Sequence, residues 1–164
     1  MGCNFRIGNG YDVHRLAEGL PLWLGGIEVA HSKGCVAHSD GDVLIHALCD
    51  ALLGAANLRD IGHHFPDNDA AYKNIDSKIL LQKVMDLLRK KGYELVNADI
   101  TLILQRPKIQ SFIEKMQQRL SAVMQVSQEQ ISLKATTSEG IGFVGREEGV
   151  AAYATVLVEK VKGS

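Results

Sequence analysis

The chain has 164 residues, of which 46% are hydrophobic, and 18 Lys and Arg residues against 19 Asp and Glu residues give a net charge of -1. A chain of this length fits a single domain over residues 1–164 and is long enough to bury a core. The balanced charge offers no basic stripe, which argues against nucleic acid as a partner. We therefore expect a small molecule or a protein as the partner.

Cysteine usage and hydropathy favour a cytoplasmic protein. The three cysteines, Cys3, Cys35 and Cys49, are odd in number and lack the C-x-x-C spacing, which is typical of free thiols in a reducing compartment. No apolar stretch approaches the roughly 20 residues that span a bilayer. The first six residues also lack the apolar core of a signal peptide. We expect no membrane association.

The first part of the chain is predicted to be β-structure. Residues 5–11 have the pattern of a strand. Residues 22–24 and 27–29 flank Gly25-Gly26, and paired glycines supply the positive φ of a two-residue turn. This pattern predicts a small N-terminal hairpin.

A helix follows, and then a long loop. From Asp40 or Asp42 to about Ala56, apolar residues recur at helical spacing, with Ser39 or Asp40 available as the N-cap. Residues 58–72 show little periodicity, which predicts a loop. Because this loop is long for a compact domain, we expect it to have a functional role.

The second half alternates between helices and strands. Residues 77–91 and 109–124 have helical periodicity, and Gly92 ends the first of these helices. Residues 93–105 form a nearly continuous apolar run, typical of a strand buried on both faces. Two further strands are predicted over residues 131–135 and 150–161. The order predicts an α+β sandwich: a mixed four-stranded sheet with helices on one face, plus the hairpin.

Two polar clusters in apolar surroundings are candidates for a metal site. Asp12 and His14 are two apart, so if the run from Phe5 is a strand that reaches them, both side chains leave the same face. Asp42, His46 and Asp50 are four apart on a predicted helix and share one face. One carboxylate and two imidazoles suit Zn²⁺, and three protein ligands leave the fourth position open. The alternative is structural: a turn-forming aspartate and a hydrogen-bonded core histidine.

A second cluster spans residues 134–146. Its glycines and hydroxyls, with Glu139 and Arg146, favour an anion-binding loop, because small residues let backbone N–H groups approach a phosphate and arginine binds it in a bidentate manner. Glu139 beside hydroxyls is a reasonable anchor for Mg²⁺. The alternative is a capping box, Thr136-x-x-Glu139, at the start of a helical turn.

Three other segments each allow two interpretations. His38 and Ser39 before a helix suit phosphate binding or a plain N-cap. Residues 60–62 and 65–69 offer acceptors for sugar hydroxyls, or solvated turn chemistry. Arg106-Pro107-Lys108 suits a phosphate clamp or a solvated turn. We expect His63-His64 to lie on the surface.

The motifs GYDVH, HSDGD, DALLGA, DIG, FPD, KATT and GFxGR stand in this order along nearly the whole chain. With this series the chain resembles the 2-C-methyl-D-erythritol 2,4-cyclodiphosphate synthases, enzymes of the non-mevalonate isoprenoid pathway. The resemblance implies a cyclising phosphorus–oxygen lyase. Its reaction converts 4-diphosphocytidyl-2-C-methyl-D-erythritol 2-phosphate to the 2,4-cyclodiphosphate and CMP.

The resemblance also implies a role for each cluster. Asp12, His14 and His46 would bind one zinc ion per subunit, and Glu139 would hold Mg²⁺ or Mn²⁺ on the substrate diphosphate. His38 and Thr137 would stabilise the transition state. The implied substrate contacts comprise Asp12, His14, His38, Ser39, Asp60, Ile61, Gly62, Phe65, Pro66, Asp67, Asn68, Asp69, Leu104, Gln105, Arg106, Pro107, Lys108, Ile109, Thr136, Thr137, Ser138, Glu139, Phe143 and Arg146.

The implied assembly is a homotrimer with active sites between subunits and sheets that face a central channel. Phe143 and Arg146 match residues of a channel cavity proposed to bind an isoprenoid diphosphate. The chain departs from the family pattern at Asn9, Arg106 and Tyr153, where a histidine, a small residue and an acidic residue are common. Residues 1–4 would be a short extension, in which Cys3 has no assignable role.

Two rival functions use the same residues. A generic zinc hydrolase would activate water at the three ligands, although the sequence shows no separate general base beside them. A trimeric nucleotide-sensing or scaffold protein would use the metal and phosphate sites only for assembly.

Overall fold

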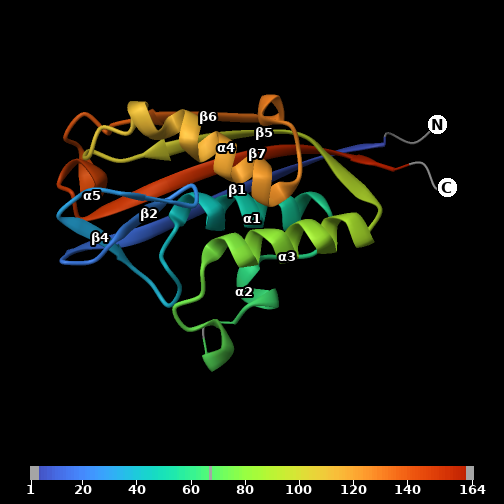
Figure 1. Ribbon diagram of the computed structural model, residues 1–164, viewed down its shortest axis with the longest axis horizontal. Coiled ribbons are helices and arrows are strands. Elements are labelled where there is room, and N and C mark those ends of the chain that lie inside the picture. The colour runs from blue at the N-terminus through green and yellow to red at the C-terminus, as the bar shows by residue number, and fades with distance from the viewer. Residues whose placement is uncertain (1–3, 67, 162–164) are drawn as a thin grey trace.

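A computed structural model describes residues 4–66 and 68–161. Its main sheet has the strand order β4-β1-β7-β5-β6 (Figure 1). The strands are β1 (Phe5–Glu18), β4 (Lys33–Val36), β5 (Tyr93–Ile103), β6 (Ile131–Thr136) and β7 (Gly149–Lys160). Only the β5–β6 pair is parallel, so the sheet is mixed. The predicted α+β class is confirmed.

The main sheet has five strands, and the prediction of four was wrong. Strand β1 does not end at Tyr11 but continues to Glu18, and its last part pairs with β4 from Arg15↔Val36 to Glu18↔Lys33. Lys33–Val36 is too short to show a strand period in the sequence. The predicted hairpin forms a separate two-stranded sheet of β2 (Leu22–Leu24) and β3 (Ile27–Val29).

Helices α1 (Val43–Ala55), α3 (Ser77–Lys90) and α4 (Ile113–Met124) lie on one side of the main sheet (Figure 1). The predicted loop over residues 58–72 contains the short helix α2 (Ile61–His64) and the 3₁₀ turn η1 (Ala70–Tyr72). The helix predicted from residue 109 begins as a 3₁₀ turn, η2 (Gln110–Phe112). The remaining short elements are η3 (Gln128–Gln130) and α5 (Gly142–Gly145).

No helix within residues 4–66 and 68–161 is long and apolar enough to cross a membrane. Cys35 and Cys49 are buried free thiols, as expected, whereas Cys3 lies outside the described residues. Burial raises the pKa of Cys35 to about 12.

The two faces of the sheet differ in exposure. In β5, which was predicted to be buried on both faces, buried side chains such as Ile100 and Leu102 alternate with partly or fully exposed ones. The face away from the helices exposes Ile7, Tyr11 and Tyr153, with the two tyrosine rings 4.7 Å apart between centroids. One face therefore packs on α1 and α4, and the other is an uncovered, partly apolar surface.

Gly8 and Gly10 allow β1 to pack directly on the backbone of α1. A Cβ atom at Gly8 would lie 1.8 Å from the Ala51 carbonyl oxygen, and one at Gly10 would lie 1.9 Å from the Ala47 oxygen. Both distances are far inside van der Waals contact. Because backbone atoms cannot move aside as a side chain tip can, only glycine fits at these two positions.

Substitution of Gly10 by alanine is therefore expected to force β1 and α1 apart and to lower the free energy of unfolding by about 3 kcal/mol, at the upper end of overpacking costs. Gly54→Ala is the matched control, because Gly54 lies in the same helix with no atom near its would-be Cβ. The control is expected to stabilise the protein by up to about 1 kcal/mol through helix propensity. Denaturant unfolding measures both, and equal stability of Gly10→Ala and the wild type would contradict the packing argument.

Candidate functional site

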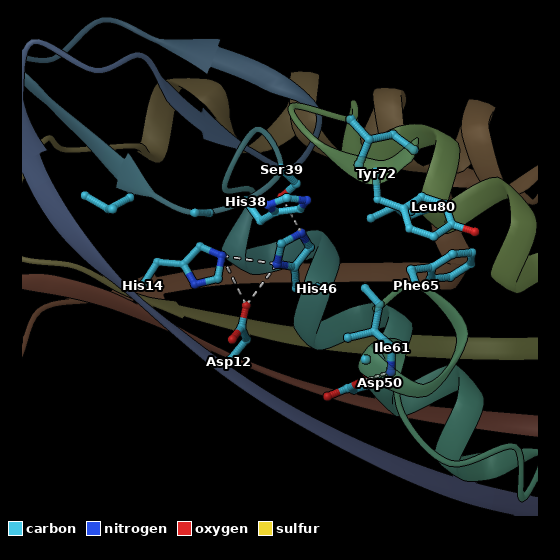
Figure 2. A pocket seen from close by; sticks show the side chains of 14 residues that line it. Asp12, His14, His38, Ser39, His46, Asp50, Ile61, Phe65, Tyr72 and Leu80 are labelled. Carbon is cyan, nitrogen blue, oxygen red and sulfur yellow. Dashed lines mark hydrogen bonds and ion pairs between the residues drawn. The ribbon is translucent and has the colours of Figure 1, made fainter. Parts of the chain in front are cut away.

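Three side chains from β1 and α1 converge at one end of the α1–β1 contact. Asp12 and His14 project from the helix-facing side of β1, as their two-residue spacing predicts. His46 lies in the first turn of α1 and is largely buried. Figure 2 shows the two imidazoles and the carboxylate pointing toward one another.

The ligand atoms of these residues are closely spaced. His46 Nδ1 lies 3.1 Å from His14 Nε2 and 3.2 Å from Asp12 Oδ2, and His14 Nε2 lies 3.5 Å from Asp12 Oδ2. A tetrahedral metal with bonds of about 2.05 Å has ligand atoms about 3.4 Å apart. The three residues thus form a candidate metal site with the correct spacing.

The hydrogen bond at the far side of His14 supports this interpretation. His14 Nδ1 lies 2.8 Å from the Val13 carbonyl oxygen, which can only accept, so Nδ1 carries the proton of the neutral ring. His14 Nε2 therefore presents a lone pair toward a carboxylate oxygen and another imidazole nitrogen. A cation among these atoms would satisfy all three.

The charge of Asp12 also acts on His46. Burial alone would lower the pKa of His46, but the hydrogen bond and the negative charge of Asp12 raise it, and the net pKa lies above the ordinary value. In the absence of a metal, this environment favours a positive charge at the position where a metal ion would supply one.

Asp42 does not belong to the metal site, although it lies one turn before His46. It is fully buried and forms the N-cap of α1: its oxygens accept hydrogen bonds from Ile45 N at 3.1 Å, Gly25 N at 3.0 Å and Gly26 N at 2.7 Å. Burial raises its pKa despite these bonds. Neither Ser39 nor Asp40 is the N-cap that the sequence suggested.

A cavity of about 340 Å³ opens beside the triad (Figure 2). His38 and Ser39 form part of its wall. His38 Nε2 is buried without a hydrogen-bond partner among the described residues, so it is available to a bound group. The cavity is lined by Asp12, His14, Val36, Ala37, His38, Ser39, His46, Asp50, Ile61, Gly62, Phe65, Tyr72, Ile75 and Leu80.

The loop after α1 contributes a second wall of this cavity. Asp60 is the N-cap of α2 and accepts from His63 N, while Ile61, Gly62 and Phe65 line the cavity. His64 is not simply on the surface as predicted, because it is half-buried and its Nε2 lies 2.7 Å from Leu58 O.

Other predicted members of this loop lie further out. Pro66, Asn68 and Asp69 are exposed and do not line the cavity. Asp69 caps η1 by accepting from Ala71 N, as the turn-chemistry alternative requires. Asp67 lies outside the described residues.

A second cavity, of about 250 Å³, lies where β5 and β6 end. It is lined by Leu104, Gln105, Pro107, Lys108, Ile109, Gln110, Ala135, Thr136 and Thr137. Gln105 Oε1 accepts from Gly140 N at 3.3 Å and connects this cavity to the 138–142 loop. Arg106 points elsewhere, since it is exposed and forms an ion pair of 3.5 Å with Glu147.

Glu139 occupies an exposed loop with a φ of 54°. Its Oε1 accepts from Thr137 Oγ1, and its backbone N donates to the same hydroxyl oxygen. No helix begins here, so the capping box that was the alternative is not formed; α5 starts only at Gly142. Ser138 Oγ donates to Ile141 O and stabilises the loop.

Phe143 and Arg146 line a third cavity, of about 720 Å³, which differs from the 340 Å³ cavity but also has His14 of the triad in its wall. Arg15 and Lys33 also line it, as do Glu147 and Glu148, and Arg146 is ion-paired with Glu148 at 3.0 Å. The predicted site residues that line cavities thus fall into three of them. Strand β7 lies between β1, which carries Asp12 and His14, and β5, at whose end the second cavity lies.

Some residues at these cavities were not predicted. Tyr72 and Leu80 line the first cavity from the loop and from α3, and only the packing of distant segments brings them there. Asp50 was noted for its helical spacing but assigned no role. Its Oδ1 accepts from Ile61 N at 2.7 Å, so it connects α1 to α2, and burial raises its pKa even though this bond lowers it.

Substitution of Asp50 by alanine is expected to release Ile61 N and to lower the free energy of unfolding by about 1 to 2 kcal/mol. Amide exchange in residues 60–64 should quicken, because α2 is too short to persist alone. Asp50→Asn keeps an acceptor oxygen and should show a smaller effect. Hydrogen–deuterium exchange tests this, and unchanged exchange in Asp50→Ala would show that the bond does not stabilise α2.

Comparisons with known proteins agree with this geometry. The YgbB family matches residues 5–159. The 2-C-methyl-D-erythritol 2,4-cyclodiphosphate synthase of Bacteroides thetaiotaomicron is 60% identical over 155 residues, which cover 94% of this chain and 98% of that protein.

Solved structures show the same fold. The bifunctional IspDF of Campylobacter jejuni matches with a TM-score of 0.93 and 43% identity over 96% of this chain, which spans 43% of that longer protein. The IspF of Plasmodium falciparum, solved as a CDP complex, matches with a TM-score of 0.85 and 34% identity over 98% of this chain and 100% of that chain. On this sequence and structural agreement, the chain belongs to the YgbB family.

Proposed function

We propose that the protein converts 4-diphosphocytidyl-2-C-methyl-D-erythritol 2-phosphate to 2-C-methyl-D-erythritol 2,4-cyclodiphosphate and CMP, as a cyclising phosphorus–oxygen lyase of the non-mevalonate pathway. The observation that carries the proposal is the triad of Asp12, His14 and His46 at the mouth of a cavity, with ligand atoms 3.1 to 3.5 Å apart. The names of the relatives support the same reaction. The reacting unit would be one domain over residues 1–164, in the cytoplasm.

The donor set fits Zn²⁺. One carboxylate and two imidazoles with tetrahedral spacing leave a fourth position open toward the cavity, which is the arrangement of catalytic zinc sites. When bound, zinc would act as a Lewis acid toward the β-phosphate. The protein's task is then to hold the substrate in line and to stabilise the developing charge, because phosphoryl transfer needs no protein nucleophile.

In the proposed reaction an oxygen of the 2-phosphate attacks the β-phosphorus, and the bond from that phosphorus to the bridging oxygen of CMP breaks. The unpaired His38 Nε2 and the Ser39 hydroxyl line the cavity and would contact phosphoryl oxygens there. Thr137 would stabilise the transition state, with Thr136 and Ser138 beside it. Glu139 would hold Mg²⁺ or Mn²⁺ on the diphosphate, which neutralises the departing CMP.

The remaining contacts would divide between two cavities. Asp60, Ile61, Gly62 and Phe65 would line the methylerythritol and ribose part beside the triad, and residues 66–69 would add further substrate contacts. The 104–109 segment would bind the cytosine, and Lys108 would approach the diphosphate. Arg106 is the weakest member of this set, since its ion pair with Glu147 turns it toward another loop.

We propose a homotrimer with the active site between subunits. Strand β1 carries Asp12 and His14, and the 104–109 segment follows β5. Val13 of β1 and Ile103 of β5 both pair with Ala151 of β7, so β1 and β5 are two strand spacings, or about 10 Å, apart. A second copy would bring another subunit's 104–109 cavity beside the triad. The sheet face that exposes Ile7, Tyr11 and Tyr153 suits burial in such an assembly.

This sheet face would then face a central channel, where Phe143 and Arg146 would meet an isoprenoid diphosphate.

His46→Ala is expected to lower CMP release more than about a hundredfold, because loss of the metal removes several kcal/mol of charge stabilisation. Zinc content should fall with it, while circular dichroism and the trimer stay unchanged. His63→Ala, at an exposed histidine outside the cavity, is the control. Near-normal turnover of His46→Ala in metal-controlled buffer would refute the assignment of zinc.

For Glu139→Gln, we expect turnover to fall and the Mg²⁺ or Mn²⁺ concentration needed for half-maximal activity to rise about tenfold. The amide keeps the shape and the acceptor for Thr137, so the loop should persist. Glu114→Gln, at an exposed residue of α4, controls for the change in net charge. An identical metal titration for Glu139→Gln and the wild type would mean that Glu139 does not hold the second metal.

A further inference from the structure

We propose that Asp40 and Ser77 are positioning residues that fix which nitrogen of His46 carries its proton, and so present His46 Nδ1 to the metal as an unprotonated ligand. The inference rests on the proposed metal site and adds to it two residues that lie outside the triad. Neither residue lines the cavity.

A chain of three side chains, His46, Ser77 and Asp40, connects α1 to the N-terminus of α3, and we call this chain the relay. His46 Nε2, on the opposite side of the ring from the triad, lies 3.0 Å from Ser77 Oγ. Ser77 Oγ donates to Asp40 Oδ1 at 2.5 Å, and Ser77 N donates to Asp40 Oδ2 at 2.9 Å. Ser77 is fully buried, so water does not compete for its hydroxyl.

The direction of each hydrogen bond follows from how many hydrogens the Ser77 hydroxyl, the Asp40 carboxylate and the His46 ring can donate. A carboxylate only accepts, so the bond between Asp40 and Ser77 uses the single hydroxyl hydrogen of Ser77. Ser77 Oγ therefore presents a lone pair to His46 Nε2, and this bond exists only if Nε2 carries the hydrogen. When a metal occupies the site, the imidazole is neutral and has one N–H, so a hydrogen on Nε2 leaves the Nδ1 lone pair for the metal. The metal then takes the place of the proton that Nδ1 would otherwise donate to Asp12 Oδ2, 3.2 Å away.

Ser39 does not set this direction. Its Oγ lies 3.2 Å from His46 Nε2 and also accepts from Gly41 N at 3.2 Å, but no acceptor holds its hydroxyl hydrogen in these two bonds. A hydroxyl that is free to rotate could donate to Nε2 as readily as accept from it. The carboxylate of Asp40 removes this freedom at Ser77.

The backbone holds Asp40 in place for this role. Asp40 N donates to Ile75 O at 3.1 Å, and Asn74 N donates to His38 O at 2.8 Å. Asp40 Oδ1 also accepts from Asp42 N at 3.2 Å. The segment before α1 is thus fixed to the segment before α3. Hydrogen bonds of this kind to metal-bound histidines orient the ring and raise metal affinity in proteins.

The test measures zinc affinity by competition with a chromophoric chelator, and the ¹H–¹⁵N signals of the histidine rings in the zinc-loaded protein. In the wild type, we expect His46 to bind zinc through Nδ1 and to show an Nε2–H signal that exchanges slowly with water. Ser77→Ala and Asp40→Ala, which remove the hydroxyl and its acceptor, should each weaken zinc binding about tenfold to a hundredfold and speed the exchange of that signal.

Asp76→Ala is the matched control. Asp76 caps the same end of α3 by accepting from Lys78 N, and His46 is not its partner in that bond, so its variant should keep wild-type zinc affinity and exchange. Wild-type affinity in both relay variants would overturn the proposal. Weaker affinity with an unchanged Nε2–H signal would also overturn it, because the residues would then act through packing alone.

If the variants do not fold, the wild-type protein still tests the proposal through the nitrogen of His46 that binds zinc. Coordination of zinc by His46 Nε2 rather than Nδ1 would contradict the relay directly. A wild-type protein that binds no zinc would refute the metal site of the proposed function itself. Zinc bound through Nδ1 without CMP release would refute the proposed reaction and leave the relay intact.

Discussion

The geometry of the site depends on the direct contact between the backbones of β1 and α1. Gly8 meets Ala51, and Gly10 meets Ala47 one helical turn earlier. Two strand residues advance about 6.6 Å and four helical residues about 6.0 Å, so strand and helix stay in step along this contact. Two residues after Gly10 comes Asp12, and directly before Ala47 comes His46. A side chain at either glycine would separate the ligands that the site must bring within 3.5 Å.

Two aspartates fix the N-termini of α1 and α3 and so complete the geometry of the site. Asp42 joins the start of α1 to the turn of the β2–β3 hairpin through three backbone N–H groups. Asp40 joins the segment before α1 to the start of α3. The packed elements β1 and α1 thus hold the metal ligands. The residues proposed to contact the sugar and the phosphates lie instead in the 58–72 loop and the 136–146 loop. This division is common in enzymes, where a stable scaffold positions functional loops.

The sequence predicted the parts of the fold that depend on local periodicity. The two-residue spacing of Asp12 and His14 correctly placed them on one face of a strand, and the glycine pair correctly predicted the hairpin. Pairing between distant segments was harder: β4 joins the sheet only because β1 continues to Glu18, and four residues carry no detectable period. The apolar run of β5 suggested two buried faces, but burial depends on whether another layer covers the second face.

The same distinction holds for the candidate site. The triad could be predicted, because residue type and spacing are local signals. Ser77 could not, since a serine at a helix start has the pattern of an ordinary cap, and its contact with Asp40 spans 37 residues. At Glu139 the backbone geometry excludes only the capping box, because it shows a loop with positive φ where a capping box would need a helix. The role of Glu139 in metal binding stays a prediction.

The measurement that tests the central claim most directly is phosphorus NMR, with CMP quantified, of the pure protein incubated with the diphosphocytidyl substrate and Mg²⁺. It should be made before and after zinc chelation. The account predicts CMP release together with the paired signals of a cyclic diphosphate, and loss of both on chelation. Linear products would instead indicate a zinc hydrolase, and no turnover by folded, zinc-loaded protein would contradict the proposed reaction.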